Sequence, residues 1–200
     1  MENHWNKSIT RSAACWPCFK RLLAKGWLFS LSLAVAQGAM PMPPGKHLMQ
    51  LTSSAFKTST AIPKQFTCEG KNVSPPLTWT GTPTNVKSFA LIADDPDAPS
   101  GTWVHWVVYD LPATTTELPE DTPKSQLIPG NAKQGITDFK QVGYGGPCPP
   151  PGKPHRYFFK LYALDEMLNL KPGATKKDIE KAMSGHILAT AELVGTYERK

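Results

Sequence analysis

The spacing of apolar and polar residues changes near residue 48 of the 200-residue chain. From Leu48 onward, short apolar runs alternate with turn residues, which is typical of a β-rich domain. Three runs are continuous enough for central strands covered on both faces: residues 88–94, 105–111 and 156–164. Weaker strands are predicted at residues 48–51, 62–66, 77–79 and 127–128. We therefore expect a mainly β fold.

A short helix is predicted after the third strong run. Thr175 is followed three residues later by Asp178, the pattern of a capping box at a helix N-terminus. The helix should run to about Met183, and Gly185 should end it. Residues 187–197 fit either a last strand or a second helix, and their β-branched residues favour the strand.

The N-terminal part has the features of a signal peptide. Basic residues precede an apolar run at residues 26–36, and small residues allow cleavage after Ala36 or Ala39. A segment rich in proline and glycine follows and indicates a linker. The expected division is an N-terminal extension with the signal peptide at 1–39, a linker at 40–47 and one domain at 48–200.

The length of the apolar run indicates where in the cell the protein is located. Residues 26–36 fall well short of the roughly 20 residues that a transmembrane helix needs. We therefore expect export to the periplasm or the outside, with no stable membrane span after cleavage. A cytoplasmic location is the alternative if the extension is a start-site artefact.

The basic charge of the chain is concentrated in its leader. The formal net charge is +6, and residues 1–36 contribute five basic residues and one acidic residue, or +4. The remaining residues carry 17 basic and 15 acidic side chains, or +2. A domain so nearly neutral lacks the basic footprint of a nucleic-acid-binding protein, so we expect no nucleic acid as a partner.

The four cysteines form two pairs of different kinds. Cys15 and Cys18 make a C-x-x-C motif, but no strand precedes it, so a redox role is not expected. Cys68 and Cys148 remain after cleavage and could form a disulfide in an oxidising compartment. Sequence does not give their separation in space, so this pairing stays open.

The most distinctive stretch for function is the loop at residues 143–157, GYGGPCPPPGKPHRY. Glycine lets the backbone approach a ligand closely and proline fixes φ, so the mixture predicts a binding loop of fixed shape. We expect the N–H groups of Gly145 and Gly146 to point at a ligand as an anion-binding nest.

Other polar residues stand where loops meet the strong strands, and loops on such scaffolds commonly carry function. If these junctions converge, His105 and His155 can donate to an anion, and a carboxylate behind a histidine can fix its tautomer. Tyr157 adds a hydroxyl donor and Trp103 an apolar wall. The predicted ligand-binding residues at these junctions are Asp95, Asp97, Trp103, His105, His155 and Tyr157.

Two enzymatic alternatives have weaker support. His105, His155 and an aspartate could bind a metal ion, but they lack H-x-H or H-E-x-x-H spacing. Ser100 and Cys148 are candidate nucleophiles, but neither lies in a G-x-S-x-G pattern, and nothing indicates a lowered thiol pKa. We therefore expect no metal, no cofactor and no catalytic residue, with weak hydrolase activity as a remote alternative.

Several long phrases carry a resemblance to a known family. They are DPDAP at 95–99, WVHW at 103–106, GYGGP at 143–147 and HRY at 155–157, with CEGKNVSPPL at 68–77 and GHILATAELVGTY at 185–197. Together they resemble the phosphatidylethanolamine-binding protein family, and more closely its bacterial and archaeal branch of Raf-kinase-inhibitor-like proteins. The resemblance spans roughly residues 48–199, with the phrases in the family's order.

The resemblance implies a fold of two antiparallel sheets with a small C-terminal helical element. It also implies a pocket for phosphate-like anions, and it adds Pro147 to the pocket residues. The chain departs from the family at Cys148 and in the proline run at residues 149–151, and it lacks the longer C-terminal helix of eukaryotic members.

Together, these features predict a non-enzymatic binding protein, a monomer or a homodimer, for a small anionic ligand of the phosphate or phospholipid head-group type. The alternative is a protease or kinase inhibitor that contacts a protein partner through the proline-rich loop at the pocket rim.

Overall fold

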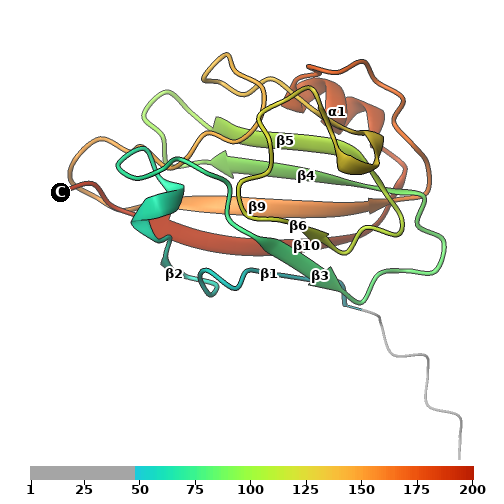
Figure 1. The fold of residues 1–200 in the computed structure, drawn as a ribbon, viewed down its shortest axis with the longest axis horizontal. Coiled ribbons are helices and arrows are strands. Elements are labelled where there is room, and N and C mark those ends of the chain that lie inside the picture. Colours follow the sequence, from blue (N-terminus) through green and yellow to red (C-terminus); the bar gives the residue numbers. More distant parts are fainter. Residues whose placement is uncertain (1–47) are drawn as a thin grey trace, which may run out of the picture. The chain divides into compact units, whose positions relative to one another are not determined.

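The computed structural model describes residues 48–200 of the chain, and these residues form a β-rich domain (Figure 1). The strands are β1 (Gln50–Thr52), β2 (Thr60–Ala61), β3 (Leu77–Thr80), β4 (Ser88–Asp95), β5 (Trp103–Pro112), β6 (Glu117–Leu118), β7 (Leu127–Ile128), β8 (Ala132–Gln134), β9 (His155–Leu164) and β10 (Ile187–Tyr197). The helix α1 spans Lys176–Ala182, and short 3-10 helices lie at Lys64–Phe66 and Pro129–Asn131.

The strands form two sheets. The large sheet has the order β2-β10-β9-β4-β5-β8-β7, and the small sheet has the order β1-β3-β6. In Figure 1 the small sheet lies in front of the large one. The long strands β9 and β10 pair antiparallel over nearly their full length, as do β4 and β9.

The main core lies between the two sheets. Side chains alternate across a strand, so every second residue of β9 faces inward, from Tyr157 through Phe159 and Leu161 to Ala163. Trp79 of the small sheet packs edge-on against Phe89 of β4, with ring centroids 5.5 Å apart. Burying the apolar rows of both sheets against each other stabilises the sandwich.

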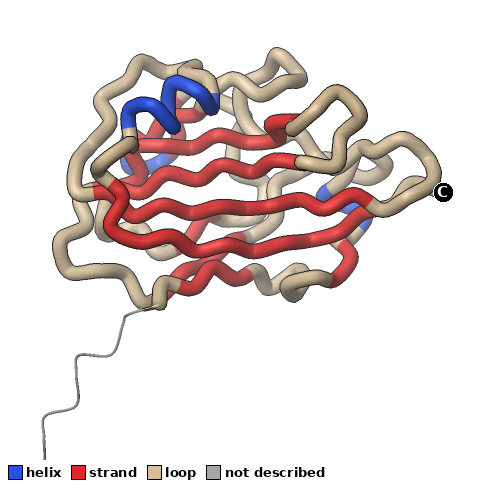
Figure 2. The backbone as a smooth tube through the Cα atoms, turned by 180° about the vertical axis from the view of Figure 1, so that it is seen from behind, coloured by secondary structure: helices blue, strands red, loops and turns tan. Residues whose placement is uncertain are grey.

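The opposite face of the large sheet is only partly covered. Ile179 and Met183, from α1 and its C-cap, pack over β4 and β5 against Ile92 and Tyr109. Figure 2 shows α1 over this part of the sheet, whereas β9 and β10 have no helix above them. The helix begins with the predicted capping box, in which the Thr175 side chain accepts from the Asp178 N–H.

Most of the predicted elements are confirmed. The three strong strands, the helix and the last strand are present, and the two-sheet architecture agrees with the resemblance. The strand predicted at residues 62–66 is wrong, because Pro63 introduces a 3-10 helix at Lys64–Phe66 and the paired residues are Thr60–Ala61. One pair is not antiparallel: β2 runs parallel to β10. The short strands β6 and β8 were not predicted.

The question left open for Cys68 and Cys148 is answered by a disulfide, with an S–S distance of 2.10 Å. It joins the turn after the first 3-10 helix to the glycine- and proline-rich loop, 80 residues later in the sequence. Backbone pairing supports the same contact, since the Cys68 N–H donates to the Pro147 carbonyl over 3.1 Å.

Several predictions fall on residues outside the described part of the chain. They are the signal peptide with its cleavage site, the linker at residues 40–47 and the motif at Cys15 and Cys18. Within residues 48–200, no helix is long and apolar enough to cross a membrane.

We expect the disulfide to make a large contribution to stability. Closing a loop of this length restricts the unfolded chain and is worth up to about 4 kcal/mol. The double substitution Cys68→Ser/Cys148→Ser should therefore lower the free energy of unfolding by about 2–4 kcal/mol in urea titrations. Reductant should destabilise the unsubstituted protein similarly and leave the variant unchanged. Equal stability of variant and parent under oxidising conditions would contradict this expectation.

Candidate functional site

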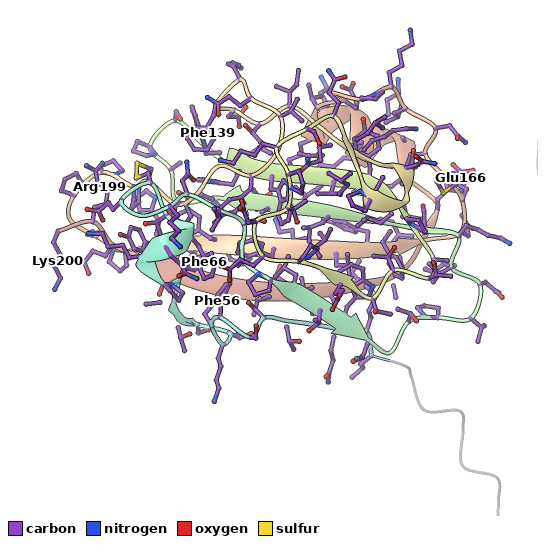
Figure 3. The ribbon with its side chains drawn as sticks, viewed as in Figure 1. Phe56, Phe66, Phe139, Glu166, Arg199 and Lys200 are labelled. Carbon is purple, nitrogen blue, oxygen red and sulfur yellow. A yellow bond between two sulfur atoms is a disulfide. The ribbon has the colours of Figure 1, made fainter. Side chains whose placement is uncertain are left out.

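A cavity of about 260 Å³ lies where the core between the sheets ends, at the C-terminal end of β4 and the N-terminal ends of β5 and β9. In Figure 3 the labelled Phe139 and Arg199 lie toward the same end of the domain. The lining residues come from these three strands and from the loops that flank them: Asp95, Ala98, Pro99, Ser100, Trp103, His105, Phe139, Cys148, Pro150, His155 and Tyr157.

A β-bulge places His105 at the cavity. Ala93 of β4 pairs with Trp106, whereas the next residue, Asp94, pairs with Val104, so His105 is an extra residue in β5. A bulge of this kind breaks the alternation of side chains and turns a residue to a new face. His105 therefore lies on the same side of the sheet as the core residue Trp106 and lines the cavity.

Two hydrogen bonds join His105 and Gly145, and each residue donates one of them. The Gly145 N–H donates to the His105 carbonyl over 2.8 Å, and His105 Nδ1 donates to the Gly145 carbonyl over 2.6 Å. Because a carbonyl oxygen only accepts, the hydrogen of the neutral ring is on Nδ1. Burial of the ring lowers the pKa of His105 below its ordinary value, although the Gly145 carbonyl and Asp95 act in the opposite direction.

Gly145 and Gly146 are needed for close packing. A Cβ at Gly145 would lie 2.5 Å from the Phe139 ring, and one at Gly146 would lie 2.4 Å from the Phe66 carbonyl oxygen. Their N–H groups are used within the protein, by the His105 carbonyl and by Asn72 Oδ1. The expectation that these two N–H groups form a nest for the ligand is therefore wrong.

His155 is held by a carboxylate. Its Nδ1 lies 2.8 Å from Asp95 Oδ2, while Asp95 Oδ1 accepts from the Asp97 N–H over 2.8 Å. Both oxygens of Asp95 thus accept hydrogen bonds, and the residue is only 3% exposed. The bond orients the His155 ring and leaves its Nε2 for a ligand.

The hydroxyl of Tyr157 lacks a partner. Tyr157 lines the cavity and is 2% exposed, yet its oxygen is buried without a hydrogen bond to any of the described residues. Its pKa is raised, mainly by burial and then by Asp95, which acts through its negative charge and through a contact with the hydroxyl that is weaker than the hydrogen bonds named above. A buried hydroxyl without a partner costs free energy, so it is expected to find one in a ligand or a water molecule.

Asp97 is at the rim and does not line the cavity. Its carboxylate forms a two-pronged ion pair with Arg156, with contacts of 2.9 Å to Nε and 2.7 Å to Nη2. These bonds lower the pKa of Asp97 to about 2. Its role is to fix the start of β9, because it also accepts from the Arg156 backbone N–H.

The outer wall comes from the glycine- and proline-rich loop. Cys148 and Pro150 line the cavity, whereas Pro147 lies behind it and pairs with Cys68 through its backbone. Arg199 of the C-terminal tail donates to the Pro149 carbonyl over 3.4 Å. The loop is thus fixed on both sides of Cys148.

The structure brings five of the nine predicted residues together around one cavity: Asp95, Trp103, His105, His155 and Tyr157. Gly145, Gly146 and Pro147 support the wall from behind, and Asp97 lies at the rim.

Phe139 is a lining residue that sequence reasoning missed. Its ring is edge-on to His105, with centroids 5.2 Å apart, and edge-on to Trp103 at 5.5 Å. It is placed by its neighbour Asp138, whose carboxylate accepts from the Val104 N–H over 2.7 Å. A single aromatic residue in a polar loop has no periodic pattern, so only the fold identifies it.

Metal ligation finds no support in the described part of the chain. Within residues 48–200, no three histidine, cysteine or carboxylate side chains are grouped as ligands for an ion. Asp94, next to Asp95, points to the other face of the sheet and pairs with Lys160 and Lys176.

The described residues thus form a two-layer β sandwich with a small cavity at one end, lined by aromatic rings and a few polar side chains. The family model described as phosphatidylethanolamine-binding protein matches residues 52–198. The chain therefore belongs to the phosphatidylethanolamine-binding protein family, as the sequence phrases predicted, and it is a binding protein of that family.

Relatives from distant organisms match most of the domain. The UPF0098 protein of Aquifex aeolicus is 55% identical over 157 residues, which are 78% of this chain and 91% of that protein. The UPF0098 protein of Methanothermobacter thermautotrophicus is 51% identical over 151 residues, 76% of this chain and 99% of that protein.

Two solved structures share the fold. A putative phosphatidylethanolamine-binding protein homologue from Chlamydia trachomatis is 44% identical, with a TM-score of 0.71 over 77% of this chain and 99% of its own. YbcL from E. coli, described as a new member of the mammalian family, is 40% identical with a TM-score of 0.71, over 76% of this chain and 99% of its own.

The ion pair at the rim can be tested by titration. We expect the Asp97 carboxyl carbon to titrate in NMR spectra with a pKa of about 2, and the substitution Arg156→Gln to return it toward 3.8. Because the folded pKa is lowered, the stabilisation by Asp97 is present above about pH 4 and is lost as the pH falls through 2. Asp178, whose pKa is lowered by Thr175, is the internal control and should not change. An unchanged Asp97 pKa in the variant would contradict the assignment.

Proposed function

We propose that this protein binds a small ligand with a phosphate group, or a similar anion, in the cavity between β4, β5 and β9. The observation that carries the proposal is the buried, unpaired hydroxyl of Tyr157 in the same cavity as two histidines. His105 and His155 each use Nδ1 within the protein, so each retains Nε2 for a ligand. A cavity of about 260 Å³ suits a head group of this size.

The mode of binding follows from the surroundings of the anion. The Tyr157 hydroxyl donates to one ligand oxygen, and a histidine donates from Nε2 when it is protonated. The rings of Trp103 and Phe139 cover the ligand's apolar part and exclude water from these polar contacts. A hydrogen bond to a charged group in such a site is worth more than one in water.

Binding without catalysis is part of the proposal. Cys148, the best candidate nucleophile in the sequence, is bonded to Cys68 and has no free thiolate. Ser100 also lines the cavity, but its hydroxyl forms no hydrogen bond with either cavity histidine in the described structure. These contacts support a site that holds a ligand and does not attack it.

We also propose that the protein is exported. The support is the disulfide between Cys68 and Cys148, because such bonds form and persist mainly in oxidising compartments. Cys148 of this disulfide also lines the cavity, so the shape of the binding site depends on an oxidising compartment.

The role of the hydroxyl is tested by Tyr157→Phe, which removes one oxygen atom. We expect the affinity for O-phosphoethanolamine, measured by calorimetry, to fall by about ten- to a hundredfold, because a hydrogen bond to a charged group is worth about 1.5–3 kcal/mol. The matched control is Tyr144→Phe, since the Tyr144 hydroxyl donates to the Phe66 carbonyl over 2.8 Å and does not line the cavity. The control should lose stability and keep its affinity. Equal affinity of Tyr157→Phe and the parent would contradict the proposed contact.

A second candidate function is inhibition of a protease or a kinase through the rim loop. The observation in its favour is that residues 151–154 are exposed while the preceding Cys148 is anchored by the disulfide. A rigid exposed loop loses little conformational freedom when it binds a partner.

The loop substitution Pro151→Ala/Lys153→Ala/Pro154→Ala separates the two functions, because none of these residues lines the cavity. If the loop is the contact surface, inhibition of the target enzyme should fall at least tenfold while the affinity for O-phosphoethanolamine stays the same. Undiminished inhibition by the folded variant would exclude this loop as the contact.

A further inference from the structure

The cavity has no permanently positive side chain. Its polar lining consists of Asp95, His105, His155, two hydroxyl groups and the Trp103 indole, and none of the lysines and arginines in residues 48–200 lines it. Arg156 is near in sequence, but its side chain is held by Asp97 at the rim. Asp95 is therefore the one carboxylate that lines the cavity, and no lysine or arginine of the described residues lies there to balance it.

The bonds at Nδ1 decide what the two histidines offer to a ligand. His105 donates from Nδ1 to the Gly145 carbonyl, and His155 Nδ1 faces the Asp95 carboxylate, which already accepts from the Asp97 N–H. Burial favours the neutral form of His105, and a neutral imidazole carries only one N–H group, so the remaining Nε2 of His105 is an acceptor. The cavity is thus rich in acceptors although it is proposed to hold an anion.

We infer that the site selects anions that bring their own acidic proton, such as hydrogen-phosphate monoesters, and disfavours sulfate monoesters of the same charge and shape. This inference rests on the proposed function and specifies the ligand chemistry of the same cavity.

The reason lies in one hydrogen atom. A phosphate monoester loses its second proton with a pKa of about 6, so at a lower pH it is a monoanion with one P–OH group. This P–OH donates to a histidine Nε2, while an ionised oxygen accepts from the Tyr157 hydroxyl. The proton can also move from the phosphate oxygen to Nε2, which gives an imidazolium beside a dianion with the same total charge.

A sulfate monoester has no such proton at neutral pH. Its oxygens would meet the Nε2 lone pair of His105 and the negative charge of Asp95, with no hydrogen between them. Buried acceptors that face each other without a donor cost free energy, as seen when a site built for a hydroxyl rejects an analogue that lacks it. Binding a sulfate ester against His105 would therefore require this histidine to take a proton from solvent.

The burial of His105 makes that proton uptake unfavourable near pH 7. Burial favours its neutral form, and the carboxylates of Asp94, Asp95 and Asp138 only partly compensate. The uncharged Tyr157 ring faces it from β9, with centroids 5.1 Å apart. Above pH 6 the complex with a phosphate ester must take up one proton as it forms, so its affinity should fall up to tenfold per pH unit.

The test compares three ligands by calorimetry on the full chain: O-phosphoethanolamine, its sulfate counterpart 2-aminoethyl hydrogen sulfate, and ethanolamine. At about pH 6 we expect the phosphate ester to bind at least about tenfold more tightly than the sulfate ester, since one proton-donating contact is lost. At about pH 7.5, titrations in buffers of different ionisation enthalpy should show uptake of about one proton per phosphate ester bound.

The outcomes separate the two proposals. Equal affinity for the phosphate and sulfate esters, without proton uptake, would overturn the selectivity and leave the anion site intact. If neither ester binds at millimolar concentration, or if ethanolamine binds as tightly as O-phosphoethanolamine, the proposed function itself is overturned. Tighter binding of the phosphate ester with uptake of one proton supports both.

Discussion

The two-way hydrogen bonding between His105 and Gly145 is the interaction on which the site depends. It fastens the glycine- and proline-rich loop to β5, fixes the tautomer of His105 and brings Gly145 against Phe139, where a Cβ would lie 2.5 Å from the ring. The disulfide holds the same loop a few residues later, so the cavity wall is supported by both a covalent bond and a polar pair. The other half of the cavity follows from Asp95, which orients His155.

The elements that could be predicted from the sequence are those whose pattern involves residues close together in the chain. Continuous apolar runs identified β4, β5 and β9, and a capping box identified α1, because these patterns report on neighbouring residues. The histidines and Asp95 were recognised from their positions at strand ends. The turn at Pro63 and the contact of Phe139 were missed, since the first depends on local φ preferences inside an apolar run and the second on packing between distant segments.

The glycines show where a local argument fails. Paired glycines such as Gly145 and Gly146 often form an anion-binding nest. Here their N–H groups donate to His105 and Asn72, and the absence of a side chain allows close packing. The ligand contacts are thereby left to side chains, with an acceptor at His105 Nε2, a carboxylate at Asp95 and a donor at Tyr157. An anion fits this arrangement only together with a proton, which links the architecture of the wall to the chemistry of the ligand.

The central claim is that His105 and His155 face one ligand in one cavity. It is tested most directly by following the imidazole nitrogen signals of the histidines in NMR spectra while O-phosphoethanolamine is added. The account predicts that the Nε2 signals of His105 and His155 shift together and saturate at one ligand concentration, whereas His186, which bonds to Asp165 outside the cavity, does not respond. Unchanged signals of both cavity histidines at millimolar ligand would contradict it.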